Sequence, residues 1–320
     1  MAKVARMYYD QGIRQKEITE RLSIHQSTVS RLLRRAREAN IVRISITTPP
    51  GIFAELEDAL EKKFGLKEAV VIDSRTDEDH LVRDLGAAAA FFLETTVKPG
   101  SIIGISSWSR GLLAMVETLR STDSGRGGKV VQILGGVGAA MTQYHATQLA
   151  QRLASLIGAT PVLLQAPGVV GSAEAKRVLV RDVSVRQAAD LFDQVDLALV
   201  GIGSMEPSKL LVSSGNAFSP QERIELREQG AVGDICLRFY DHAGKPIKSA
   251  LQNRVIGIEL EALKRIDRVV GIAGGPGKIS AILGALLGQH LNILITDRQT
   301  AESLIEAAPA RWQPGIAQRG

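Results

Sequence analysis

Apolar residues recur at helical spacing near the start of the chain, over residues 15–36. The repeat marks one helical face before a short break at residues 23–25 and a second face after it. The apolar positions are Ile18, Leu22, Val29, Leu32 and Leu33. This pattern predicts two short amphipathic helices that meet at a turn.

The second predicted helix is polar on the side opposite its apolar face. Arg can bridge O6 and N7 of guanine, Gln can pair with N6 and N7 of adenine, and Ser or Thr hydroxyls mostly hold phosphates. Such a surface is typical of a helix-turn-helix that binds double-stranded operator DNA. The candidate DNA-binding residues are Gln15, His25, Gln26, Ser27, Thr28, Ser30, Arg31 and Arg34.

The turn departs from the commonest helix-turn-helix pattern at two positions. Thr19 stands where Ala often allows close helix contact, and Ser23 stands where the turn often has Gly. If Ser23 adopts a positive φ, the strain is about 1–2 kcal/mol, which a packed domain can absorb. Asn40 suits a left-handed helix end and residues 41–46 read as a short strand, so we expect a wing. A helical hairpin used only for oligomerisation is the alternative.

Charge separates the N-terminal segment from the rest of the chain. Residues 1–50 contain ten Lys or Arg and four Asp or Glu, a net charge of +6. The remaining 270 residues contain 29 basic and 30 acidic side chains, a net charge of −1. This asymmetry indicates a small module that binds a polyanion, attached to a nearly neutral body. A solvated basic helix face is the alternative.

A Pro-Pro-Gly sequence at residues 49–51 interrupts regular structure and predicts a boundary between domains 1–50 and 51–320. Directly after it, apolar residues recur at helical spacing over residues 53–60, with charged residues on the other face. We expect this helix to pack against the body of the domain or against a second subunit.

Short apolar runs alternate with helical patterns in the larger part of the chain. The runs are residues 69–73, 101–106, 129–134, 196–203, 235–241, 268–273 and 292–297. Continuous apolar strands separated by helices indicate a mainly parallel sheet with helices on both faces. The sequence therefore predicts an α/β domain.

Ligands of parallel α/β sheets bind beyond the carboxyl ends of strands, so the residues that follow each run are candidates. The first such loop, residues 106–111, precedes a helix expected to begin near Leu112. Its hydroxyls, its amides and the helix N-terminus suit a phosphate, and Arg110 adds positive charge. An ordinary serine cap of the helix is the alternative.

The second loop, Gly274, Gly275, Pro276, Gly277 and Lys278, precedes a helix predicted over residues 279–287. Glycines let the backbone approach an anion, and Lys can neutralise it. The loop fails as a P-loop because a Gly stands six rather than five positions before Gly277 and Ile follows the Lys. Nucleotide hydrolysis is therefore not expected. A third loop with Gly135 and Gly136 is a weaker signal, since such glycines also serve simple turns.

Composition adds three expectations. The single cysteine, Cys236, leaves no disulfide within the chain and no cysteine cluster for zinc, which suits the reducing cytoplasm. No apolar run reaches the roughly 20 residues of a membrane helix, so no membrane partner is expected. Nothing in the sequence calls for a cofactor.

Six segments, taken in order, resemble the SorC/DeoR family of sugar-binding bacterial transcriptional regulators across nearly the whole chain. They are QKEITERLSIHQSTVSRLLRRAREANIVRI, GISSWSRG, VVQILGGVG, DLALVGIGS, GAVGDICLRFYDHAG and VVGIAGGPGKISAILGALL. The resemblance implies a winged helix-turn-helix and an effector domain similar in fold to ribose-5-phosphate isomerase, glucosamine-6-phosphate deaminase and CoA transferases. It also implies homotetramers on DNA that a sugar, polyol or sugar phosphate releases or rearranges.

The same resemblance implies an effector site. Its candidate residues are Ser106, Ser107, Ser109, Arg110, Gly135, Gly136, Asp234, Gly274, Gly275 and Lys278. Asp234 suits sugar hydroxyls, although an acid after a glycine turn is also an ordinary cap. Leu134 departs from the family, which often has a polar or basic residue facing the ligand there. Because residues 130–138 contain no lysine, this strand cannot form an imine with an open-chain sugar.

The main alternative class is a sugar-phosphate isomerase or deaminase with an accessory DNA-binding domain. Proton transfer next to a carbonyl needs a positioned base, for which Asp234 is available. His145, His242 and His290 show no partner pattern. A third class is a scaffold with a vestigial pocket, against which the two anion-ready loops argue. We therefore expect a regulator rather than an enzyme.

Overall fold

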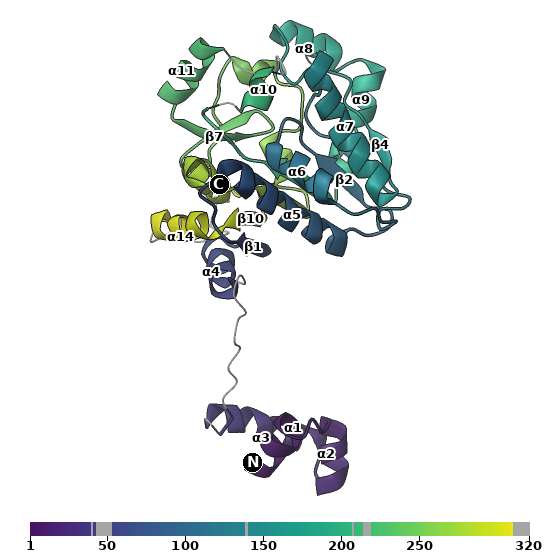
Figure 1. Cartoon of the computed structure of the whole chain (residues 1–320), viewed down its shortest axis with the longest axis vertical. Helices are drawn as coiled ribbons and strands as arrows, with labels where there is room; N and C mark the ends of the chain where they lie inside the picture. The colour runs from purple at the N-terminus through teal and green to yellow at the C-terminus, as the bar shows by residue number, and fades with distance from the viewer. Residues whose placement is uncertain (40, 43–52, 138–139, 207, 214–218, 310–320) are drawn as a thin grey trace, which may run out of the picture. The chain divides into compact units, whose positions relative to one another are not determined.

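The computed structural model divides into two compact units, Met1–Pro50 and Gly51–Gly320 (Figure 1). Within the ranges it describes, no helix is long and apolar enough to cross a membrane. The described residues are 1–39, 41–42, 53–137, 140–206, 208–213 and 219–309.

The small unit contains three helices around one apolar core. They are α1 (Ala2–Tyr9), α2 (Gln15–Leu22) and α3 (Gln26–Glu38). Ile18 of α2 and Val29 of α3 are fully buried in this core, as the helical spacing predicts. Ser23 ends α2 with a φ of 49°, so the left-handed turn is present despite the missing glycine. Helix α1 was not predicted from the sequence, and it contributes Val4 to the core.

The predicted wing falls mostly outside the described residues. Asn40 and residues 43–46 are among those not described, and Ile41 and Val42 lie in a bend. Val42 packs against the core of the small unit. The wing therefore stays a prediction.

The large unit is built on a seven-stranded parallel sheet, which confirms the α/β prediction. Its strand order is β1-β10-β9-β5-β2-β3-β4. The strands are β1 (Glu68–Ile72), β2 (Ile102–Ile105), β3 (Lys129–Gln132), β4 (Thr160–Val162), β5 (Leu197–Gly201), β9 (Arg268–Ile272) and β10 (Ile293–Asp297). Strands β2, β3 and β4 follow one another toward one edge of the sheet. Strands β5, β9 and β10 follow one another toward the other edge. The connection reverses between β2 and β5, which is where ligands of such sheets bind.

Helices cover both faces of this sheet (Figure 1). One face packs against α5 (Glu78–Thr96), α6 (Arg110–Thr118) and α7 (Ala140–Ile157). The other packs against α4 (Ala54–Phe64), α12 (Leu260–Leu263), α13 (Ile279–Leu287) and α14 (Arg298–Ala307). The remaining helices of the unit are α8 (Ala173–Leu179), α9 (Val183–Ala189), α10 (Lys209–Ser213), α11 (Pro220–Glu228) and the 3-10 turns η1 (Phe192–Gln194), η2 (Leu251–Arg254) and η3 (Pro276–Lys278). Successive residues of a strand point to opposite faces of the sheet. Because helices cover both faces, these strands are apolar on both sides.

One predicted strand is wrong. Residues 235–241 form two strands of a separate antiparallel sheet, in which β7 (Ala231–Ile235) pairs with β6 (Gly203–Ser204) and β8 (Arg238–Asp241). The chain turns between β7 and β8 at Cys236 and Leu237, with φ values of 53° and 59°. Both turn residues are buried, so apolar side chains occupy a position where Gly or Asn usually signals a hairpin.

The helix after the linker, α4, packs on the body of its own unit, against β1 and α14. The carboxylates of Glu61 and Glu57 accept the N–H groups of Ala69 and Val71 at 2.9 Å each. Because β1 is an edge strand, these two carboxylates occupy donors that would otherwise be free to pair with another chain.

Candidate functional site

The three candidate loops lie at the carboxyl ends of strands of the same parallel sheet. Residues 106–110 follow β2, residues 134–137 follow β3, and residues 274–278 follow β9. Strand β5 lies between β2 and β9 and leads directly into β6 of the small sheet, which carries Asp234 on its neighbour β7. The fold therefore gathers segments more than 160 residues apart in the sequence at one edge of the sheet.

The loop after β2 is held by internal hydrogen bonds. Ser107 is buried; its hydroxyl donates to the Leu134 carbonyl at 2.9 Å and accepts from the Gln132 side chain at 2.9 Å. Trp108 has a φ of 62°, and its indole N–H donates to the Gly135 carbonyl at 3.3 Å. The loops after β2 and β3 are thus tied together, with a strained backbone of the kind often found at functional sites.

The other two serines of this loop also have partners within the protein. Ser109 caps α6 by accepting the Leu112 N–H at 3.3 Å, so the helix begins at Arg110, slightly earlier than predicted. The Ser106 hydroxyl, which is buried, accepts the Gly201 N–H at 3.4 Å. The three hydroxyls therefore shape the loop, and their contact with an effector stays a prediction.

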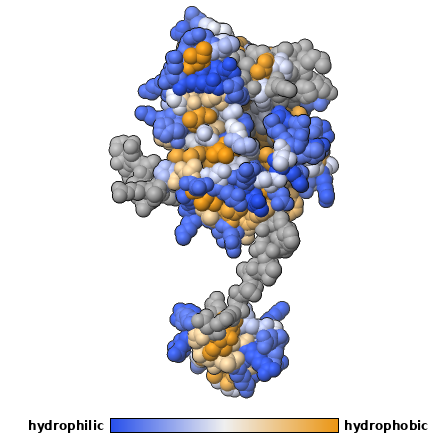
Figure 2. All heavy atoms as spheres, turned by 60° about the vertical axis from the view of Figure 1, so that its left-hand side comes forward, coloured by the Kyte–Doolittle hydropathy of each residue, from blue (hydrophilic) through white to orange (hydrophobic). Residues whose placement is uncertain are grey.

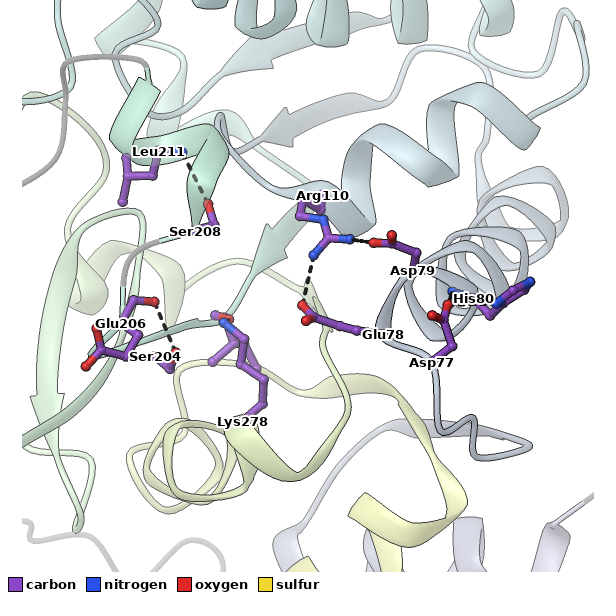
Figure 3. A network of polar contacts seen from close by, with 11 residues as sticks. Asp77, Glu78, Asp79, His80, Arg110, Ser204, Glu206, Ser208, Leu211 and Lys278 are labelled. Atoms are coloured by element: carbon purple, nitrogen blue, oxygen red, sulfur yellow. Dashed lines mark hydrogen bonds and ion pairs between the residues drawn. The ribbon is translucent and has the colours of Figure 1, made fainter.

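Arg110 extends from the start of α6 to the first turn of α5 (Figure 3). Its guanidinium donates to the Glu78 carboxylate at 2.8 Å and also pairs with Asp79. Arg110 is partly exposed, whereas both acidic side chains are largely exposed. The cation of this cluster was predicted from the sequence, whereas its two carboxylates were not.

The glycine loop after β9 is fixed by a buried acid. Gly275 has a φ of 89°, and its N–H donates to Asp297 Oδ2 at 2.8 Å and to Thr300 Oγ1 at 2.9 Å. A Cβ at Gly274 would collide with the same carboxylate. Hydrogen bonds keep the pKa of Asp297 below its usual value although burial opposes them. The glycines thus allow close approach of the protein's own carboxylate, which the sequence analysis did not identify.

Lys278 lies at the end of this loop, in the short 3-10 turn before α13. Its ammonium donates to the Ile202 carbonyl at 3.0 Å, just beyond β5. Burial lowers the pKa of Lys278, while the nearby carboxylates of Asp234 and Glu78 oppose that change. Lys278 is therefore a partly buried cation that faces negative charge from two directions.

Asp234 is 8% exposed and accepts the Leu237 N–H at 2.9 Å, which caps the turn between β7 and β8. Burial raises the pKa of this carboxyl to about 6, while the Leu237 hydrogen bond and the charge of Lys278 partly oppose the change. A Cβ at Gly203 would overlap the carboxylate, so the neighbouring strand needs a glycine there. Asp234 therefore caps a turn and also supplies charge near Lys278.

The loop after β3 offers little side-chain chemistry. Leu134 is 2% exposed and packs in the core, while Gly135 lies so close to the Pro167 carbonyl that a Cβ would collide with it. Gly136 is buried. Leu134 is therefore an apolar core residue at a position where the family often has a polar or basic residue that faces the ligand.

Among the histidines whose side chains the structure describes, His290 is buried and does not suit a general base. Burial lowers the pKa of His290 to about 4, and its Nε2 lies 2.7 Å from the Gly244 carbonyl. His242 is exposed, and the side chain of His145 lies outside the described residues. In the part of the chain that the structure describes, no group of His, Cys, Asp and Glu could hold a metal ion.

The candidate DNA-binding residues lie on α2, on α3 and in the turn between them. On α3, Gln26, Ser27, Ser30, Arg31 and Arg34 are exposed, whereas Thr28 is half-buried. Gln15 at the start of α2 accepts a hydrogen bond from the Ser30 hydroxyl at 3.0 Å, and His25 is exposed just before α3.

Comparison with known proteins gives consistent results. Residues 49–306 match the family described as "Putative sugar-binding domain". The chain is 35% identical over 304 residues to the deoxyribonucleoside regulator of Bacillus subtilis, covering 95% of this chain and 96% of that protein. It is 35% identical over 310 residues to the sorbitol operon regulator of Klebsiella pneumoniae, covering 96% and 97%.

The fold agrees with these matches. The crystal structure of the full-length sorbitol operon regulator SorC from Klebsiella pneumoniae superimposes with a TM-score of 0.73 and 33% identity, covering 95% of this chain and 97% of that one. These relatives are regulators of transcription, which confirms the regulator class over the enzyme alternative. The chain belongs to the SorC/DeoR family of sugar-binding transcriptional regulators.

Proposed function

We propose that residues 1–50 bind operator DNA as a winged helix-turn-helix and that residues 51–320 sense the effector and form the oligomer. The exposed face of α3 carries the groups that suit a major groove, including Arg31 and Arg34. The net charge of +6 in residues 1–50 supports binding to the phosphate backbone.

The effector is a sugar phosphate bound where the loops after β2 and β9 converge. The observation that carries this proposal is that two cations, Arg110 and Lys278, lie at the switch point of the sheet and interact electrostatically. Asp234 supplies an acceptor for sugar hydroxyls. The names of the relatives, a deoxyribonucleoside regulator and a sorbitol operon regulator, support a ligand of the sugar or polyol class.

The protein works as a cytoplasmic homotetramer with two quaternary arrangements, one preferred by effector and one by DNA. Large apolar side chains are exposed on the large unit, among them Phe91, Val178 and Val183, and are candidates for contacts between subunits. Figure 2 shows apolar groups scattered between polar ones on one face of that unit. Effector and DNA must then change each other's affinity by the same factor.

The effector assignment is tested by thermal denaturation of the purified protein with sugars, polyols and their phosphates. A ligand at 100 times its Kd stabilises by about 2.7 kcal/mol, which is readily detected. We expect a phosphate ester to stabilise more than its parent sugar and to change the affinity for DNA. Stabilisation by uncharged sugars alone would contradict the phosphate assignment.

The assignment of α3 as the helix that contacts the DNA bases is tested with duplexes selected from a random pool. Replacing Arg31 or Arg34 by Ala should cost about 1–3 kcal/mol of specific binding where the side chain contacts a base. Arg6→Ala on α1 is the matched control, since it removes the same charge from the same unit. Unchanged affinity in both α3 variants would defeat this assignment.

A further inference from the structure

Arg110 is shared between the candidate site and the first turn of α5. Its guanidinium contacts Glu78 at 2.8 Å and also pairs with Asp79, the first two residues of that helix. We propose that Glu78 and Asp79 set the affinity and charge selectivity of the effector site by competing with the effector for Arg110. This inference rests on the proposed function, because it requires an anion to reach Arg110.

The competition follows from the chemistry of the guanidinium. Arg presents a planar fork of N–H donors that matches the oxygens of a carboxylate or a phosphate. Glu78 accepts from one terminal nitrogen of Arg110 and Asp79 from the other. A phosphate that binds Arg110 end-on, between the two terminal nitrogens, therefore competes with the two carboxylates for these nitrogens.

The two carboxylates are displaceable. The Glu78 and Asp79 side chains are 80% and 76% exposed, and ion pairs so open to water are weak. Once displaced, both acids remain in the first turn of α5, where negative charge is favourable next to the helix N-terminus. Asp77 caps that turn independently by accepting the His80 N–H at 2.7 Å, so the helix does not depend on Arg110 to begin.

Glu78 also acts on the second cation. Its negative charge favours the protonated form of Lys278, and the charge of Arg110 disfavours it. Figure 3 shows Glu78 extending between Arg110 and the side of the cluster where Lys278 lies. The first turn of α5 therefore lowers the positive potential of the site as a whole. The effect on a ligand should grow with the ligand's negative charge and vanish for an uncharged sugar.

The test is the double variant Glu78→Gln and Asp79→Asn, which keeps the size of both side chains. Its matched control is Asp84→Asn with Glu117→Gln. These changes remove two charges from α5 and α6, at an ion pair with Arg75 and at an exposed position. The probes are inorganic phosphate, ribose 5-phosphate and ribose, titrated into the full chain by calorimetry and thermal shift. Both sets are also made in an Arg110→Ala background.

We expect the double variant to bind the two phosphate probes about three- to tenfold more tightly, in line with the loss of two exposed ion pairs. Ribose should bind equally to both proteins, and the control should match the wild type. Without Arg110 the gain should be smaller, because only the effect of Glu78 on Lys278 then remains. Phosphate binding that is unchanged or weaker in the double variant would overturn the inference, as would an equal gain in the Arg110→Ala background.

The same experiment separates the inference from the proposed function. If the wild type binds phosphate probes and the variant gains nothing, the effector assignment stands and the competition is refuted. If only the variant binds them, the competition is supported, because the acids then mask the site. If neither protein binds either phosphate probe, both proposals fail together.

Discussion

The two cations of the candidate site differ in how the fold holds them. Lys278 is partly buried, hydrogen-bonded to a main-chain carbonyl, and lies near the buried carboxyl of Asp234. Arg110 is paired instead with two largely exposed carboxylates of a different helix, Glu78 and Asp79. Lys278 is thus fixed before any ligand arrives, whereas Arg110 can exchange partners at little cost.

This difference has a physical consequence for binding. A preorganised, partly desolvated cation gives a stronger contact with an anion than an exposed cation that must first leave another anion. We therefore expect Lys278 to supply affinity and Arg110 to tune it. Changes on the buried side should have large effects, and changes on the exposed side should have small ones.

The largest effect is expected from Asp234 as a function of pH. Its pKa rises from 3.8 to about 6 on folding, so the unfolded chain ionises this group first as the pH increases. The free energy of unfolding should therefore fall by about 3 kcal/mol as the pH rises from about 4 to 6.

Urea unfolding at several pH values, compared between the wild type and Asp234→Asn, checks this prediction. The variant should lack that part of the pH dependence. The control is Asp193→Asn, at a 76% exposed carboxylate. Parallel pH profiles for the wild type and Asp234→Asn would contradict the raised pKa of this buried carboxyl.

The second effect compares the two cations directly. Lys278→Ala should weaken a phosphorylated ligand about ten- to a hundredfold, as expected for loss of a charge-assisted hydrogen bond. Arg110→Ala should weaken it by only about two- to fivefold, because the wild-type residue must first give up its carboxylates. Calorimetry with a phosphate ester and its uncharged parent measures both. Equal losses for the two ligands would remove the phosphate assignment.

The sequence predicted the main sheet well because long apolar runs mark strands that are buried on both faces. Six of the seven predicted runs lie in the parallel sheet. Strand β4 was missed because it has three residues, includes Pro161 and is mostly exposed. The hairpin at Cys236 was missed because its turn residues are apolar and buried, so no polar break appears in the sequence.

The sequence predicted the two cations of the site but not the acidic residues that contact its loops. Loops after strands can be found from the sequence, which is how Arg110 and Lys278 were identified. Glu78, Asp79 and Asp297 reach those loops only through the strand order, which places β10 beside β9 and β1 on the far side of β10. Acidic residues at a helix start are also ordinary dipole-favoured positions, so their presence alone carried no signal.

The third effect concerns the interior of the loop after β2. Ser107→Ala would leave the buried Leu134 carbonyl and the Gln132 amide without their hydroxyl partner. Such a loss costs about 1–3 kcal/mol, which urea denaturation can measure. The control is Ser303→Ala, where an exposed hydroxyl bonds within its own helix. A stability loss no larger than the control's would show that the buried network does not hold this loop.

The smallest effect is expected at the end of the same loop, where the half-buried Ser109 caps α6. Ser109→Ala should cost about 1 kcal/mol, whereas Ser109→Gly should cost only a few tenths, because Gly tolerates the cap position and lets water reach the free amides. The free energies of unfolding of the two variants decide between roles. If Ala is tolerated as well as Gly, Ser109 is not acting as a cap. Its hydroxyl, unlike that of Ser107, would then be available to a ligand at little structural cost.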